Sequence, residues 1–209
     1  MRIYIKSQSN SVLKNYLESL LRFRKEHWKK LPFYYQGVED FLLQHGKQFE
    51  SSPLTEEEEE IVFKALEEYT QVFGDPQPQH CFDTSQRIMR APSNLMYAEG
   101  YVYNGIGQTR HGWNVINGKV IDFVLQHPQK TGTYRPITGV IPEGWEYFGM
   151  EVPSKLVFEN MLAELKRVHE RGDGQFRVVT PVLDNYEQDF PLLRKKYNPN
   201  DHKESAPPD

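Results

Sequence analysis

Residues 111–122 read HGWNVINGKVID and carry the clearest structural signal in the central part of the chain. Asn117 and Gly118 lie between two largely apolar stretches, and Asn-Gly is the strongest short-range signal for a two-residue β-hairpin turn. With that turn, residue 116 lies opposite residue 119, and residue 113 lies opposite residue 122. His111 and Asp122 are then diagonal neighbours on one face, with backbones about 7–8 Å apart. The hairpin therefore predicts a His–Asp pair.

The sequence around the hairpin predicts an α+β chain. Apolar residues at helical spacing favour helices over residues 9–31, 34–49, 53–73, 81–90 and 154–168. Alternating or apolar segments favour strands over residues 1–5, 95–103, 112–116, 119–125, 145–149 and 176–182. Residues 131–144 contain Gly, Pro and Thr and are expected to form a long loop.

An acidic run, residues 56–60, follows Thr55 in the third predicted helix. Thr55 and Glu58 fit a capping box, and negative charge in a first turn complements the helix dipole. We interpret the run as a well-capped, solvated helix start. A metal site or a site for a basic partner is the alternative.

Two prolines and a glycine in residues 74–79, GDPQPQ, mark a change of composition. We expect a helical N-terminal part over residues 1–74 and an α+β core over residues 75–197. The polar, proline-containing tail, residues 198–209, is expected to be disordered.

The composition excludes several classes of protein. The 209 residues carry a net charge of −4, whereas proteins that grip nucleic acid through its phosphates usually have a basic excess. No apolar run is long enough to span a membrane, and the N-terminus lacks the apolar segment of a secretory signal. We therefore expect a cytoplasmic protein that binds neither nucleic acid nor membranes.

Cys81 is the single cysteine, so neither an internal disulfide nor a Cys-rich zinc site is available. It opens a predicted helix, where unpaired backbone N–H groups and the helix dipole favour thiolate over thiol. His111 is the expected base and Asp122 the residue that orients it. His80 is a rival base and Asn114 a rival orienting residue, although strand parity places Asn114 on the opposite face.

Metal and nucleotide motifs are missing from the sequence, because the histidines are scattered and no glycine-rich phosphate loop occurs. We therefore expect no metal site and no cofactor.

Four segments carry a resemblance to a known family: CFDTSQRIM (81–89), YAEGYV (97–102), HGWNVINGKVID (111–122) and WEYFGMEVPS (145–154). They resemble the papain-like superfamily in its transglutaminase-like branch, and more narrowly a group of uncharacterised phage and bacterial proteins of that type. The resemblance covers residues 79–154. It implies a Cys-led helix packed on an antiparallel sheet and a Cys81-His111-Asp122 triad, with the N-terminal helical part added to that core.

Three further residues are candidates for binding substrate. Gln79 resembles the oxyanion-side glutamine of papain-like enzymes, with an ordinary loop residue as the alternative. Glu99 would orient a substrate amine or pair with a base, unless it faces outward from its strand. Trp113 would either wall the pocket or belong to the core.

These features predict a cysteine-dependent acyl-transfer enzyme acting through a thioester intermediate. It would be an amide or peptide hydrolase, or a transglutaminase-like transferase, with a peptide or small amide as substrate. The alternative is a catalytically silent papain-like binding or interaction protein, for instance one encoded by a phage. The sequence does not indicate an oligomeric state.

Overall fold

The computed structural model describes residues 11–27, 35, 37–89, 95–128, 134–171 and 181–185. These residues form an α+β fold, in which helices pack around one six-stranded antiparallel sheet. The strand order in the sheet is β1-β6-β2-β3-β4-β5. In chain order the elements are α1 (Val12–His27), α2 (Val38–His45), β1 (Lys47–Gln48), α3 (Glu56–Phe73), α4 (Cys81–Ile88), β2 (Met96–Tyr103), β3 (Gln108–Ile116), β4 (Lys119–Pro128), β5 (Tyr134–Thr138), β6 (Glu146–Val152), α5 (Ser154–Arg171) and a 3₁₀ helix (Val182–Asn185).

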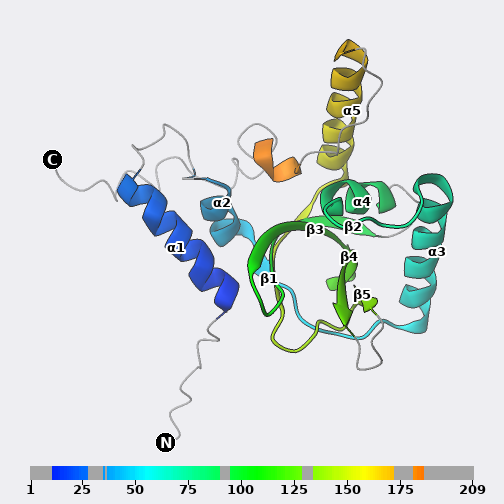
Figure 1. Ribbon diagram of the computed structural model, residues 1–209, viewed down its shortest axis with the longest axis horizontal. Coiled ribbons are helices and arrows are strands. Elements are labelled where there is room, and N and C mark those ends of the chain that lie inside the picture. Colours follow the sequence, from blue (N-terminus) through cyan, green and yellow to red (C-terminus); the bar gives the residue numbers. More distant parts are fainter. Residues whose placement is uncertain are drawn as a thin grey trace, which may run out of the picture.

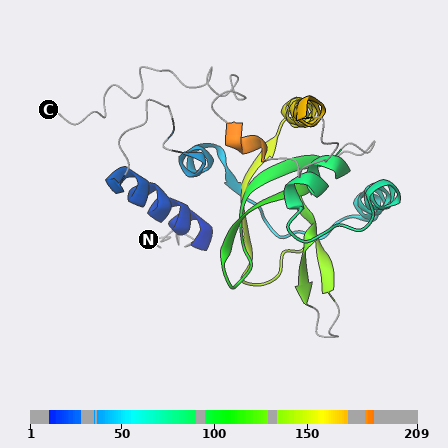
Figure 2. The ribbon, with the colours of Figure 1, turned by 45° about the horizontal axis from the view of Figure 1, so that its top comes forward.

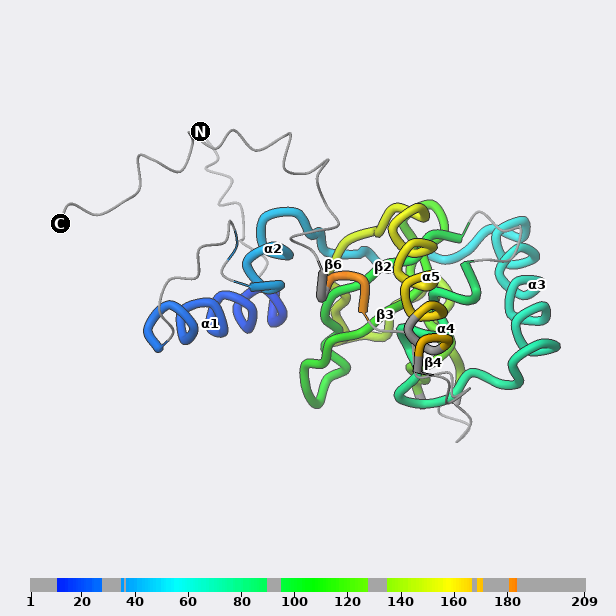
Figure 3. The backbone as a smooth tube through the Cα atoms, turned by 90° about the horizontal axis from the view of Figure 1, so that it is seen from above, coloured from blue at the N-terminus to red at the C-terminus, as the bar shows by residue number. Residues whose placement is uncertain are grey.

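The helices lie on different sides of the sheet (Figure 1). Seen from above, α1 and α2 lie at one end of the molecule and α3 at the other (Figure 3). Leu17 of α1 and Phe41 of α2 pack in one cluster with Tyr97 and Tyr101 of β2. Burying these side chains removes apolar surface from water and fixes the first two helices on the sheet.

A second apolar cluster joins α3 to the sheet. Val62 and Ala65 of α3 pack there with Ile88 of α4 and Ile116 of β3. The domain boundary at residue 74 stays a prediction. The structure shows that elements from both sides of this position share the same apolar clusters.

The Asn117-Gly118 hairpin is confirmed. Both turn residues have left-handed backbones, with φ of 49° and 81°, as a two-residue turn of this type requires. Residues 114, 115 and 116 pair with residues 121, 120 and 119, which is the predicted register. The ladder between β3 and β4 stops there, and β4 continues by pairing with β5 through an irregularity between Asp122 and Gln126.

The sheet is strongly curved. Two strands separate β6 from β4, yet the Tyr147 hydroxyl of β6 donates a hydrogen bond to Asp122 Oδ2 of β4 at 2.9 Å. Figure 1 shows β2 and β3 bending round, and Figure 2 shows α4 and α5 packed outside this curve. The concave side is filled by large side chains, among them Phe49, Trp113 and Tyr147.

Several predicted elements are confirmed with small changes at their ends. The capping box of Thr55 and Glu58 begins α3, and the helix predicted from Cys81 is α4. The strands predicted over 95–103, 112–116, 119–125 and 145–149 correspond to β2, β3, β4 and β6, and the helix predicted over 154–168 is α5.

Two predicted elements are wrong in part. The helix predicted over residues 34–49 ends at His45, because Gly46 is extended and Lys47–Gln48 pair with β6 as strand β1. The loop predicted over residues 131–144 contains strand β5. Pro136 suggested a loop there, because proline has no backbone N–H to donate to a neighbouring strand. Since β5 lies at the edge of the sheet, a proline is tolerated in it.

Some predictions fall on residues outside the described part. These are the strand over 1–5, both ends of the first helix and the tail from 198. Most of the strand over 176–182 also lies outside it, and Val182 itself begins the 3₁₀ helix rather than ending a strand. Within the described residues, no helix has the length and apolar character needed to cross a membrane.

Candidate active site

Cys81 is the first residue of α4, and its side chain is buried, with 7% of the residue exposed. The preceding residue, His80, makes no side-chain cap, and the first backbone bond of the helix runs from the Thr84 N–H to the His80 carbonyl at 2.8 Å. The N–H groups at this end of the helix therefore lack the side-chain acceptor that caps many helices.

Asp122 holds His111 in one orientation. His111 Nε2 lies 2.7 Å from Asp122 Oδ2, and both residues are buried. Asp122 also accepts hydrogen bonds from the Tyr147 hydroxyl and from the backbone N–H groups of Val124 and Leu125, at 2.9, 3.0 and 2.9 Å. Because Nε2 is engaged by Asp122, Nδ1 is the imidazole nitrogen left to face Cys81.

Cys81 and His111 share a side-chain hydrogen bond. Burial raises the pKa of the Cys81 thiol, but His111 and the N–H of Gly112 outweigh it and lower the pKa from 9.0. Burial likewise lowers the pKa of His111, but Asp122 outweighs it and raises the pKa to about 10. Both shifts favour transfer of the thiol proton to the imidazole, which is the direction toward a thiolate–imidazolium pair.

Helix α4 takes the place of β4 beside the middle of β3. The Gly112 N–H donates to Cys81, and the Gly112 carbonyl accepts from Ser85 Oγ at 3.0 Å. Asn114 Nδ2 donates to the Ser85 carbonyl at 2.8 Å. The bonds to Gly112 lie beyond the last β3–β4 pair, Asn114 with Ile121, so α4 occupies the open edge of β3 and brings Cys81 to His111.

Glu99 is fully buried, so the alternative that it faces outward is wrong. Its carboxylate accepts from Arg110 at 2.6 Å, from the Tyr97 hydroxyl at 3.0 Å and from the Leu183 N–H at 3.2 Å. Burial raises the pKa of Glu99, and the ion pair with Arg110 opposes that rise. Glu99 is thus tied to a cation and a phenol, and Tyr97 separates it from α4.

Tyr97 connects Glu99 to α4. The fully buried Gln86 of α4 donates to the Tyr97 hydroxyl, and Gln86 Oε1 accepts from Asn160 Nδ2 of α5 at 3.4 Å. The Tyr97 hydroxyl therefore receives one bond from the helix that carries Cys81 and gives one to Glu99. This relay fixes α4 relative to the sheet through groups that have no access to water.

The other candidates lie around this cluster. Gln79 is exposed, with a left-handed φ of 70°, and in the described residues no hydrogen bond joins it to the cluster. His80 is exposed, and the imidazole bonded to Cys81 is that of His111. Asn114 lies on the opposite face of β3, as strand parity predicts, and its amide binds the Ser85 carbonyl.

Trp113 belongs to the core. It is fully buried, its ring lies edge-on to those of Phe49 and Tyr147, and it stacks beside His111 with centroids 6.4 Å apart. The alternative that Trp113 walls an open pocket does not agree with this burial.

The sequence did not reveal the residues that support the site: Tyr147, Tyr97, Gln86 and Ser85. Each of these residues bonds to a partner on another element of the fold. Some of these bonds join a side chain to a backbone group, which leaves no pattern in the sequence. The available signal was the resemblance itself, because CFDTSQRIM contains Ser85 and Gln86, YAEGYV contains Tyr97 and WEYFGMEVPS contains Tyr147.

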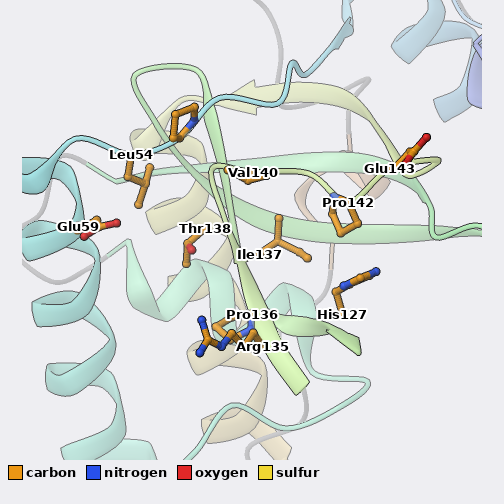
Figure 4. Close-up of a pocket in the computed structure, with 11 residues that line it drawn as sticks. Leu54, Glu59, His127, Arg135, Pro136, Ile137, Thr138, Val140, Pro142 and Glu143 are labelled. Atoms are coloured by element: carbon orange, nitrogen blue, oxygen red, sulfur yellow. The ribbon is translucent and has the colours of Figure 1, made fainter. Parts of the chain in front are cut away.

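A separate pocket lies at the β5 edge of the sheet (Figure 4). Its volume is about 520 Å³, and its lining includes Leu54, Glu59, His127, Arg135, Ile137 and Glu143. None of Cys81, His111 and Asp122 lines it. Among the described residues, no group of three His, Cys, Asp or Glu side chains is arranged to hold a metal ion.

Comparisons with protein-family models, with curated proteins and with solved structures give no match to this chain. The candidate site therefore rests on the arrangement of its own side chains.

Gly112→Ala tests the close docking of α4. A Cβ at this position would lie 2.9 Å from Phe82 Cδ1 and 3.0 Å from the Tyr97 ring and hydroxyl. We expect overpacking to lower the free energy of unfolding by about 1–3 kcal/mol, measured by urea denaturation. Gly107→Ala is the control, since nothing lies within 4 Å of a Cβ there. Equal stability of the two variants would contradict the docking.

Tyr97→Phe tests the relay. Losing the hydroxyl leaves Gln86 without this acceptor and Glu99 without one donor, which we expect to cost about 1–3 kcal/mol of stability. We also expect the pKa of Cys81, measured from the pH dependence of its alkylation, to rise toward its ordinary value. Tyr101→Phe is the matched control, because that hydroxyl donates to Glu39 instead. The relay is refuted if both variants leave the alkylation profile unchanged.

Cys81→Ser tests the charge pair through pH-dependent stability. Charged His111 stabilises the fold below pH 6.5, and this contribution is lost as the pH rises through about 10. The lowered pKa of Cys81 works oppositely, contributing stability above pH 9.0 that is lost as the pH falls. We therefore expect the unfolding free energy of Cys81→Ser to fall more steeply with rising pH than that of the wild type. Parallel curves would show that the two groups are not coupled.

Proposed function

We propose that this protein is a cysteine-dependent acyl-transfer enzyme, either an amide or peptide hydrolase or a transglutaminase-like transferase. One observation carries the proposal. A buried thiol at a helix start shares a hydrogen bond with an imidazole whose other nitrogen lies 2.7 Å from a buried carboxylate. A nucleophile, a base and an orienting group in this order are the arrangement that nucleophilic catalysis requires.

The arrangement supports a two-step reaction. The Cys81 thiolate attacks the carbonyl carbon of an amide, and the His111 imidazolium donates its Nδ1 proton to the departing amine. An acyl thioester on Cys81 remains. Neutral His111 then takes a proton from the water or amine that attacks the thioester, and the thiolate leaves. Asp122 keeps the ring oriented and stabilises its charge in both steps.

The papain-like resemblance agrees with this proposal. The chain has a Cys-led helix packed on an antiparallel sheet, and His111 and Asp122 lie on neighbouring strands. We propose a papain-like core of the transglutaminase-like type on these grounds. Cys81, His111 and Asp122 are the proposed catalytic residues, and the substrate would be a peptide or small amide.

One observation favours a second function, binding without turnover. Only 7% of Cys81 is exposed, so an acyl group must enter a narrow space to reach the thiol. A catalytically silent protein of the same fold would keep the Cys81–His111 pair as a structural ion pair. Thiol chemistry separates the two functions, because a structural pair need not react with added electrophiles.

Iodoacetamide labelling tests the proposal. Cys81 is the single cysteine, so every alkylated thiol reports on the site. At pH 6 an ordinary thiol is roughly 0.3% thiolate, since its pKa is near 8.5. We expect wild-type Cys81 to react at pH 6 at least about 10-fold faster than Cys81 in His111→Ala, measured by mass spectrometry. His127→Ala, a histidine outside the cluster, should react as the wild type does.

Incubation with p-nitrophenyl acetate tests turnover. We expect an acetyl group on Cys81 that disappears with time in the wild type and does not form in His111→Ala. If an added primary amine speeds the loss of the acetyl group, the protein is a transferase. If the rate of this loss does not depend on the amine, the protein is a hydrolase. Rapid alkylation without any acetylation would favour the silent binding protein, and slow alkylation at pH 6 would overturn the activated thiolate itself.

A further inference from the structure

Helix α5 exposes a row of large apolar side chains. Phe158, Leu162 and Leu165 are 42%, 62% and 37% exposed, and their spacing places them along one side of the helix. A contiguous apolar row on a surface marks an interaction site more often than scattered apolar residues do.

This row is separate from the side of α5 that packs on the protein. Val157 and Met161 are buried in the cluster that covers β2, and Asn160 and Glu164 are buried on the same side. Figure 1 shows α5 running away from the sheet, and Figure 2 shows it nearly end-on, above the body of the molecule. The row therefore faces outward along a projecting helix.

A row of alternating charges borders the apolar row. Lys155, Glu159, Lys166 and Glu170 are exposed and follow one another along the helix as plus, minus, plus, minus. Within one helix they form two loose pairs, Lys155–Glu159 at 3.7 Å and Lys166–Glu170 at 3.8 Å. Read in the opposite direction, the charges run minus, plus, minus, plus. Two copies of this row that run in opposite directions therefore place opposite charges against each other.

We propose that α5 is a self-association surface whose partner is the α5 helix of a second copy of this chain, packed antiparallel. In that arrangement Lys155 faces Glu170 of the second copy and Glu159 faces Lys166, so all four cross-pairs are of opposite sign. In a parallel arrangement this row would lie against the opposite flank of the second copy, so these four cross-pairs would not form. The charge row thus selects both the partner and its direction.

The same register brings the apolar rows together. The twofold axis passes beside Leu162, so the two copies of Leu162 meet at the centre. Leu165 of one helix then lies about 3 Å along the axis from Phe158 of the other, at 1.5 Å per residue. Three side chains from each copy make a small contact, so the dimer should be weak and concentration-dependent. This inference does not depend on the proposed function.

Sedimentation over about a hundred-fold range of concentration tests the surface. We expect the wild type to pass from monomer to dimer and Leu162→Arg to stay monomeric, with circular dichroism confirming that the variant is folded. Ile106→Arg is the matched control, because Ile106 is an exposed apolar residue on the β2–β3 connection and should not alter the mass. A wild type that is monomeric throughout overturns the proposal, as does a dimer that Leu162→Arg leaves intact.

A charge-exchange experiment tests the antiparallel register. Lys155→Glu with Lys166→Glu makes one all-negative row, and Glu159→Lys with Glu170→Lys makes one all-positive row. Each double variant should be monomeric alone, and an equimolar mixture should restore dimers. Dimers of either variant alone, or a mixture that stays monomeric while the wild type dimerises, would refute this register.

Discussion

The structure depends on which element bonds to the backbone of Gly112 at the edge of β3. The N–H and carbonyl of this residue bond to Cys81 and Ser85 of α4 instead of to a strand. Since one edge of a strand holds only one partner, β4 must leave β3 after the pair of Asn114 with Ile121. The helix that enters this gap has its first residue beside His111. The absence of a Cβ at Gly112 lets α4 dock closely, because a Cβ there would lie 2.9 Å from the Phe82 ring and 3.0 Å from Tyr97.

The gap creates an electrostatic problem that the surrounding residues resolve. Cys81, His111 and Asp122 place three ionisable groups in one buried space, and buried charges are costly unless they are paired and hydrogen-bonded. The sulfur of Cys81 has His111 and the Gly112 N–H as partners. The carboxylate of Asp122 has His111, two backbone N–H groups and the Tyr147 hydroxyl. The curvature of the sheet is what lets Tyr147 reach across two strands.

Local signals predicted much of this arrangement. The Asn117-Gly118 turn gave the register that places His111 and Asp122 near each other, and Thr55 gave the start of α3. Strand β1 has only two residues, too few for any periodicity, and β5 contains a proline that an edge strand tolerates. Tyr147 and Gln86 reach their partners through tertiary packing, for which a single sequence carries no spacing signal.

The acidic start of α3 shows why the N-terminal segment matters to the candidate site. The Glu58 carboxylate caps its own helix and also accepts from Asn117 Nδ2 in the hairpin turn at 2.9 Å and from Lys119 Nζ at the start of β4 at 2.6 Å. Hydrogen bonds from Lys119 and Asn117 lower the pKa of Glu58 to about 2. The carboxylate therefore stays charged throughout the range in which Cys81 and His111 titrate. Helix α3 holds the turn of the hairpin that carries His111 and Asp122, so this helix is part of the frame of the site.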